Sequence, residues 1–306
     1  SMVKALSFPL CFLLMSSGLL AQQKNLETYF AQVRSGKHPN VPLDLTKPEN
    51  ATATLNRLPN FLNDSVVIVR GRAAGISRLI GTQSKITANR AKAVQQLVIA
   101  AKDKDSGNAG AALTFLSEFK KTDFSTVDKD TLFVLFKRKS AHLNILIRLM
   151  GYLEIQSSKS DLFNLSQNSS FARKERWAAL LALARMNDEQ AAADIIARVK
   201  RMPVTDAVVY EVFPDLVYTR RREATEYLIE SLNSDSKNCE SANSESAERV
   251  PCAYRAMEML APIIENYPLK LNESGDIETN DYPTALQKVR DWFKVNKDYK
   301  ILRDKF

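Results

Sequence analysis

Apolar residues recur at helical spacing along most of this chain. Between positions 141 and 153 they follow the i, i+3, i+4, i+7 course of one helical face, at Leu143, Leu146, Ile147, Met150 and Leu153. Ile145 and Leu149 add a second apolar side. A helix that is apolar on two sides is predicted to lie between neighbouring helices.

The same pattern predicts helices along the rest of the chain. Further helices are expected over residues 22–34, 86–101, 111–119, 132–137, 171–186, 190–202, 207–216, 224–232, 253–265 and 284–296. No strand pair or hairpin signal stands out, so the expected fold class is all-α. Residues 35–48 contain three prolines and are expected to form an extended connector, and 233–248 and 270–281 are expected to be polar surface loops.

Two of these helices have similar sequences, which indicates an internal repeat. Residues 144–151 align with 180–187, which pairs Met150 with Met186 and Gly151 with Asn187 at an offset of 36 residues. Gly and Asn both favour the left-handed conformation that ends a helix. The pattern therefore predicts helix pairs of similar length stacked in order.

One of these segments carries a family resemblance. Residues 173–188 (RKERWAALLALARMND) resemble a HEAT-like repeat, with a basic start, an Ala/Leu-rich helix and an Asn-Asp turn, and residues 70–81 look like a weaker copy. Pro214 resembles the proline kink of many HEAT first helices. The resemblance implies a right-handed α-α superhelix, a HEAT/ARM-like solenoid of about five to six helix pairs over residues 49–266, that serves as a binding scaffold. An irregular helical bundle is the alternative.

The remaining segments flank this repeat region. Residues 22–48 form an N-terminal helix and Pro-rich connector, and residues 267–306 form a polar loop followed by a C-terminal capping helix. Trp292 and Phe293 of that last helix are expected in the core.

Residues 1–21 have the three parts of a secretory signal. Lys4 precedes a short apolar stretch, and small residues lead to Ala21, after which cleavage is expected; Ser1 resembles a cloning remnant. The apolar stretch is interrupted and shorter than the roughly 20 residues of a membrane span. Gln22-Gln23 after the expected cleavage site resembles exported proteins of Bacteroidetes-type bacteria. The mature protein is therefore expected in the periplasm or outside a Gram-negative cell, with no stable membrane span.

Two cysteines remain after that cleavage. Cys239 and Cys252 bracket a polar loop and are expected to form a disulfide in an exported protein, with two free thiols as the alternative.

The residues give no support for catalysis. The chain has 306 residues and only two histidines, His38 and His142, without a second His at i+4 for a zinc pair. No nucleotide-binding glycine loop and no Gly-x-Ser-x-Gly motif occurs. We therefore expect no enzyme activity, no metal and no cofactor.

Basic clusters are the strongest candidate for a binding site. The sequence has 43 Lys+Arg against 35 Asp+Glu, and residues 137–222 contain 15 of the former and 9 of the latter. Four clusters are expected to form a basic ridge, with solvated helix ends as the alternative: Lys137, Arg138 and Lys139; Arg173, Lys174 and Arg176; Arg198, Lys200 and Arg201; Arg220, Arg221 and Arg222.

Three functions remain open from the sequence. The preferred one is an exported, non-enzymatic scaffold that binds a protein partner, with an acidic surface if the ridge takes part. A basic HEAT-like protein that binds nucleic acid or repairs DNA is the alternative if residues 1–21 are not cleaved. An enzyme with a site on the inner face is the third, and no residue points to it.

Overall fold

The computed structural model describes residues 10–138 and 141–306, and they are predominantly helical. The chain divides into two compact units, residues 1–142 and 143–306. This boundary lies inside residues 49–266, which were predicted from the sequence to form one continuous series of helix pairs. Within the described residues, no helix is both long and apolar enough to cross a membrane.

The first unit is built from helices that pack on their neighbours in the chain. They are α1 (Leu10–Arg34), α2 (Leu43–Thr46), α3 (Pro48–Arg57), α4 (Pro59–Leu62), α5 (Val67–Gln83), α6 (Thr87–Ala100), α7 (Ser106–Leu116), the 3-10 turn η1 (Lys121–Asp123) and α8 (Thr126–Lys137). The helix α5 packs on α6, and α6 on α7 and α8. The connector expected to be extended contains α2, and α3 and α4 lie at the start of the range 49–266 that was expected to be helical, where no separate helices had been assigned.

Among the side chains of α1 that the structure describes, Gln22 is the first that is buried. Its side-chain amide donates to the Asn50 carbonyl and to the Thr54 hydroxyl, both at 2.9 Å. Further along, Phe30 is fully buried and stacks on Phe61 with 4.0 Å between the ring centroids. Among the described side chains before Gln22, Leu20 is 66% exposed and Ala21 is also exposed.

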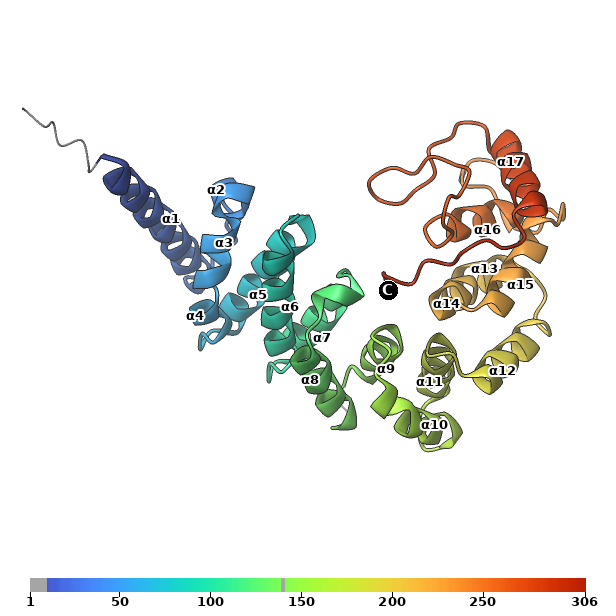
Figure 1. Ribbon diagram of the computed structural model, residues 1–306, viewed down its shortest axis with the longest axis horizontal. Coiled ribbons are helices and arrows are strands. Elements are labelled where there is room, and N and C mark those ends of the chain that lie inside the picture. Colours follow the sequence, from blue (N-terminus) through green and yellow to red (C-terminus); the bar gives the residue numbers. More distant parts are fainter. Residues whose placement is uncertain (1–9, 139–140) are drawn as a thin grey trace, which may run out of the picture. The chain divides into compact units, whose positions relative to one another are not determined.

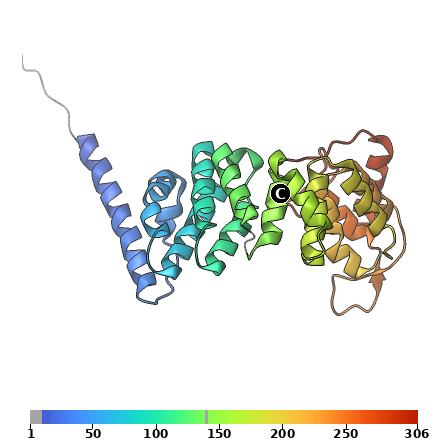
Figure 2. The same ribbon diagram turned by 90° about the horizontal axis from the view of Figure 1, so that it is seen from below.

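The second unit continues with helix pairs (Figure 1). Its elements are α9 (Leu143–Tyr152), the 3-10 turn η2 (Gln156–Ser158), α10 (Lys159–Gln167), α11 (Arg173–Arg185), α12 (Glu189–Val199), α13 (Asp206–Glu211), α14 (Phe213–Thr219), α15 (Arg222–Leu232), β1 (Cys239–Glu240), β2 (Arg249–Val250), α16 (Ala253–Leu260) and α17 (Tyr282–Val295). The helices α9, α11 and α14 pack in that order, and α10, α12 and α15 pack beside them. Figure 2 shows the same helices from below.

Three residues with positive φ in this unit are 33 positions apart, a spacing that differs from the offset of 36 expected from the sequence. Glu154, Asn187 and Arg220 follow the ends of α9, α11 and α14, and all three have positive φ, at 53°, 69° and 52°. Their numbers are 33 apart. The expectation for Asn187 is therefore confirmed, and its partner position is Glu154.

Gly151 has a different role from the expected helix stop. It lies inside α9, where a Cβ atom would stand 2.4 Å from the Tyr218 hydroxyl oxygen and 2.7 Å from the Ala182 Cα. A glycine is required here because α9 and α11 approach more closely than a side chain allows. The expectation that Gly151 ends the helix is therefore wrong, and the glycine is needed for the packing of α9 on α11.

Pro214 breaks the helix expected over residues 207–216. The chain forms α13 up to Glu211, and α14 starts at Phe213 with the proline in its first turn. Proline suits this position because the first turn of a helix needs no amide donor there.

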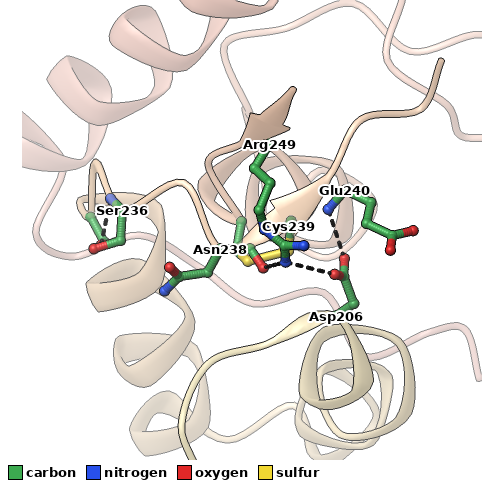
Figure 3. The surroundings of a disulfide bond; sticks show 8 residues. Asp206, Ser236, Asn238, Cys239, Glu240 and Arg249 are labelled. Carbon is green, nitrogen blue, oxygen red and sulfur yellow. Dashed lines mark hydrogen bonds and ion pairs between the residues drawn. A yellow bond between two sulfur atoms is a disulfide. The ribbon is translucent and has the colours of Figure 1, made fainter. Parts of the chain in front are cut away.

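The polar loop between α15 and α16 is fixed by a disulfide. The sulfur atoms of Cys239 and Cys252 are 2.13 Å apart, with 5.0 Å between the Cα atoms. Against the sequence expectation, a short antiparallel strand pair occurs here, and it joins Cys239 to Val250 and Glu240 to Arg249. Asp206 anchors both strands, because its carboxylate accepts from the Glu240 amide at 3.0 Å and from Arg249 at 3.1 Å (Figure 3).

The helix α17 packs on α16, and its Phe293 is buried beside Trp292 with 5.1 Å between the ring centroids. The chain then returns along the unit, where Ile301 forms a bridge with Ile264. The last helix is therefore followed by an extended segment that the sequence did not predict.

Candidate binding site

A hollow of about 960 Å³ lies in the second unit between the start of α11, the end of α12 and the α13–α14 junction. We call it the basic hollow. Its lining includes five cationic side chains, one indole and two carboxylates: Arg173, Lys174, Arg176, Arg198, Arg201, Trp177, Glu211 and Asp215.

Local sequence places three of the cations on one turn. Ala172 is the residue before α11, and its amide donates to the Glu175 carboxylate at 3.3 Å. This contact fixes the first turn, which carries Arg173, Lys174 and Arg176. The other two cations lie in the last turn of α12 and just after it.

Asp215 holds the indole of Trp177 in place. One carboxylate oxygen accepts from the indole nitrogen at 2.8 Å, and the other accepts from Arg148 at 3.0 Å. The Arg198 guanidinium carbon lies 5.8 Å from the Trp177 ring centroid. The wall of the hollow is thus a fixed aromatic face with a cation beside it.

The hollow has an excess of positive charge. Arg148 compensates the charge of Asp215, which leaves Glu211 as the other carboxylate in the lining. Within the described ranges, Arg173, Lys174, Arg198 and Arg201 form no ion pair, and the buried Nε of Arg176 has no hydrogen-bond partner. These cations are available to an anionic ligand.

The residues of the predicted ridge belong to both units and have different surroundings. Lys137 ends α8 in the first unit, where its ammonium lies 4.5 Å from the Phe133 ring centroid, and Arg138 follows it. Lys139 lies outside the described residues. Lys200 is exposed at the end of α12 and does not line the hollow.

The triplet 220–222 differs most from the expectation of three partner-facing cations. Arg220 is only 8% exposed, and burial lowers its pKa to about 9. Arg221 forms ion pairs with Glu189 and Glu223 at 2.8 and 3.0 Å. The Arg222 guanidinium lies 4.2 Å from the Tyr299 ring centroid. The expectation is wrong for Arg220, because its guanidinium is used inside the fold.

Two residues that line the hollow were not among the candidates from the sequence. Trp177 is half-buried and lines the hollow. Asp215 lies 38 residues after Trp177, so nothing local connects the two. The basic residues 173–176 directly before Trp177 were the feature of the sequence that could have indicated this site.

Among the described residues, no group of three or more His, Cys, Asp or Glu side chains could hold a metal ion. Comparisons with models of protein families, with curated proteins and with solved structures gave no match to this chain. The geometry of the hollow is therefore the main basis for a functional proposal.

Proposed function

We propose that this protein is an exported, non-enzymatic HEAT-like α-solenoid scaffold that binds an acidic segment of a partner protein in the basic hollow. The observation that carries the proposal is the convergence of five cations around one oriented tryptophan. Carboxylates would form charge-assisted hydrogen bonds with the arginines, and an apolar or aromatic side chain would pack against Trp177.

The position of the first three cations supports a binding role. Arg173, Lys174 and Arg176 lie at the N-terminus of α11, where the helix dipole disfavours positive charge by about 0.3–1 kcal/mol for each group. A bound acidic segment would compensate this charge and would also benefit from the free amides of the first turn. The cluster is therefore better suited to a bound state than to the isolated protein.

The order of helix contacts supports the solenoid. In the second unit each first helix packs on the next first helix, from α9 to α11 to α14. The left-handed residues Glu154, Asn187 and Arg220 recur every 33 residues, as expected when one helix pair stacks on another.

Two features support export. The disulfide between Cys239 and Cys252 is typical of oxidising compartments. The first described side chain of α1 that is buried is Gln22, directly after the expected cleavage site, so removal of residues 1–21 would take away none of the described buried side chains. Mass spectrometry of the protein from its native host would show a chain that begins at Gln22. An intact chain would contradict export.

Binding in the hollow is tested by titrating the full chain with an Asp/Glu-rich peptide that contains one phenylalanine. We expect binding that weakens with salt and falls at least tenfold in Arg198→Glu. Lys200→Glu is the matched control, because it changes the same charge on the same helix outside the hollow. Equal loss in both variants would contradict the proposal.

A single-stranded oligonucleotide is the competing ligand in this titration. Cations beside an aromatic face also suit nucleic acid, where bases stack and phosphates pair with arginine. We expect the acidic peptide to bind more tightly. The reverse order would favour the nucleic-acid function.

A further inference from the structure

A second pocket, of about 480 Å³, lies in the second unit between the end of α17, the segment that follows α17 and the segment that follows α16. We call it the Trp292 pocket. Its volume is in the range that holds a small ligand. Its lining includes one indole, two carboxylates, two ammonium groups and a carboxamide: Trp292, Glu265, Asp298, Lys297, Lys300 and Asn266.

The apolar wall of this pocket is an indole that the fold does not bury completely. Trp292 was expected in the core with Phe293, but only Phe293 is buried, whereas Trp292 is half-buried and lines the pocket. The Phe293 ring packs edge-on to the indole, with 5.1 Å between the ring centroids. Val295, three residues further along α17, is 81% exposed and lines the same pocket. The pocket therefore has an apolar surface that a ligand can cover.

The backbone around the pocket is held by contacts within the unit. The Glu265 amide donates to the Lys300 carbonyl at 3.0 Å. Arg222 donates to the Tyr299 carbonyl at 2.7 Å. Asn266, at the edge of the pocket, has a φ of 59°, in the left-handed region that few residues other than Gly, Asn and Asp adopt. A pocket held in this way needs little ordering when a ligand binds.

The polar side chains of the pocket are not used by the fold. Within the described part of the chain, six polar groups of the lining form neither an ion pair nor a side-chain hydrogen bond: the carboxylates of Glu265 and Asp298, the ammonium groups of Lys297 and Lys300, the Asn266 carboxamide and the Trp292 indole N–H. The other tryptophan differs, because the Trp177 indole donates to Asp215. The pocket thus offers both donors and acceptors to a ligand.

The charges of the lining balance. Two carboxylates accompany two ammonium groups, so the Trp292 pocket has no net charge, unlike the basic hollow. An ion of either sign would be attracted by one pair and repelled by the other. A neutral ligand with many hydroxyl groups suits this lining better, because each hydroxyl can donate to a carboxylate and accept from an ammonium group or an amide.

The indole adds the requirement for an apolar face on that ligand. A pyranose ring with equatorial hydroxyls directs only C–H bonds toward its two faces, and such a face packs on an indole. The equatorial hydroxyls then point outward from the ring, where polar side chains around the indole can bond them. Glucose-type rings in β-linkage combine these properties.

We propose that the Trp292 pocket is a carbohydrate-binding site, and that its ligand is a neutral oligosaccharide of β-linked glucose-type rings. One ring stacks on Trp292, and its hydroxyls bond to the carboxylates of Glu265 and Asp298 and to the neighbouring ammonium groups. The site goes beyond the proposed function because it does not involve the basic hollow.

The test titrates the full chain with cellotetraose in a calorimeter. We expect binding that becomes at least tenfold weaker in Trp292→Ala and in Asp298→Ala. Asp298 is exposed and unpaired among the described residues, so its variant should fold even if Trp292→Ala does not. Asp291→Ala is the matched control, because it removes an exposed carboxylate of α17 outside the pocket, and it should bind like the wild type.

Two outcomes of this titration would overturn the inference. One is the absence of binding by the wild-type chain at millimolar cellotetraose. The other is an affinity of Asp298→Ala that equals that of the wild type or of Asp291→Ala.

Salt separates this site from the basic hollow. Because the sugar is neutral, its affinity should change by less than twofold between about 0.05 and 0.5 M NaCl, whereas binding of the acidic peptide weakens. Arg198→Glu should lose the peptide and keep the sugar, so the two proposals fail separately. A steep loss of sugar binding with salt would contradict recognition of a neutral ligand.

Tryptophan fluorescence tests the contact itself. The chain has two tryptophans, so Trp177→Phe leaves Trp292 as the only one. We expect cellotetraose to shift the emission of this variant to shorter wavelength, because a stacked ring displaces water from the indole. Unchanged emission at a sugar concentration that saturates the calorimetric titration would overturn the assignment to Trp292.

Discussion

The guanidinium carbon of Arg185 lies 5.3 Å from the ring centroid of Tyr152, and the two residues are 33 positions apart in the chain. Tyr218 lies a further 33 positions along, and its ring centroid also lies 5.3 Å from Arg185. The three side chains come from α9, α11 and α14, and all three are buried. They form one buried cluster that joins the three helices.

Replacing Arg185 should destabilise the second unit. Arg185 is fully buried and donates to the Tyr218 carbonyl at 2.6 Å and to the backbone oxygens of Lys305 and Phe306 at 2.8 and 3.1 Å. In Arg185→Met these three oxygens lose their donor and the buried Tyr218 carbonyl is left unpaired, so we expect the free energy of unfolding to fall by about 2–4 kcal/mol in urea titrations. Arg198→Met, at an exposed position, should change it by less than about 0.5 kcal/mol. Similar effects of the two substitutions would contradict a structural role for Arg185.

The close approach of α9 and α11 can be tested with one methyl group. In Gly151→Ala the new Cβ would meet the Tyr218 hydroxyl and the Ala182 backbone, so we expect a loss of about 1–3 kcal/mol in unfolding free energy. Gly75→Ala in α5 is the matched control, because no atom lies within 4 Å of its added Cβ. There we expect a gain of about 0.5–1 kcal/mol from helix propensity. A neutral Gly151→Ala would mean that the helices can move apart freely.

Most of the long helices could be predicted because they bury one apolar stripe. The segment that forms α10 was not predicted, since Leu162 and Leu165 are its only buried apolar residues and Phe163 faces solvent. No separate helix was assigned over α3, because its sequence is mostly polar and begins with Pro48. Propensity alone does not find helices whose stability comes from tertiary packing.

The candidate site could be predicted from the sequence only in part, for a related reason. Arg173, Lys174 and Arg176 form a local run, so sequence reasoning finds them directly. Arg220 belongs to a similar run, and it is bound by residues 302–305, which lie about 80 residues later in the chain. A cationic run indicates charge, and tertiary packing decides whether that charge faces a partner or the interior.

The disulfide should contribute measurably to stability. It joins Cys239 to Cys252, which are 13 positions apart in the chain, and closing a loop of this size stabilises a fold by about 3 kcal/mol in the chain-entropy picture. Reduction should lower the melting temperature of the second unit and speed proteolysis of the loop. The double variant Cys239→Ser/Cys252→Ser should melt at the same lower temperature with or without reductant. An unchanged melting temperature on reduction of the wild type would contradict this role.

Acid should destabilise the first unit through Asp103. The carboxylate receives two hydrogen bonds from Arg70, at 2.9 and 3.0 Å, and this interaction holds the pKa of Asp103 below its ordinary value of 3.8. Because the folded state favours the carboxylate, the stabilisation is complete well above pH 4 and is lost as pH falls through the lowered pKa.

The variant Asp103→Asn isolates this contribution. At pH 7 we expect it to lower the unfolding free energy by about 2 kcal/mol, since hydrogen bonds to a charged group are lost. The difference from wild type should shrink as the pH falls below 4. A difference that stays constant between pH 7 and pH 2 would contradict the assignment.

The binding of an acidic segment in the basic hollow is tested most directly by zero-length cross-linking. Carbodiimide joins a carboxylate to a lysine only when the two are in contact, and Lys174 is the lysine that lines the hollow. We expect the Asp/Glu-rich peptide to couple mainly to Lys174 in the wild-type chain and to lose that product in Arg198→Glu. Cross-links spread equally over Lys174, Lys137 and Lys200, or unchanged in the variant, would contradict binding in the hollow.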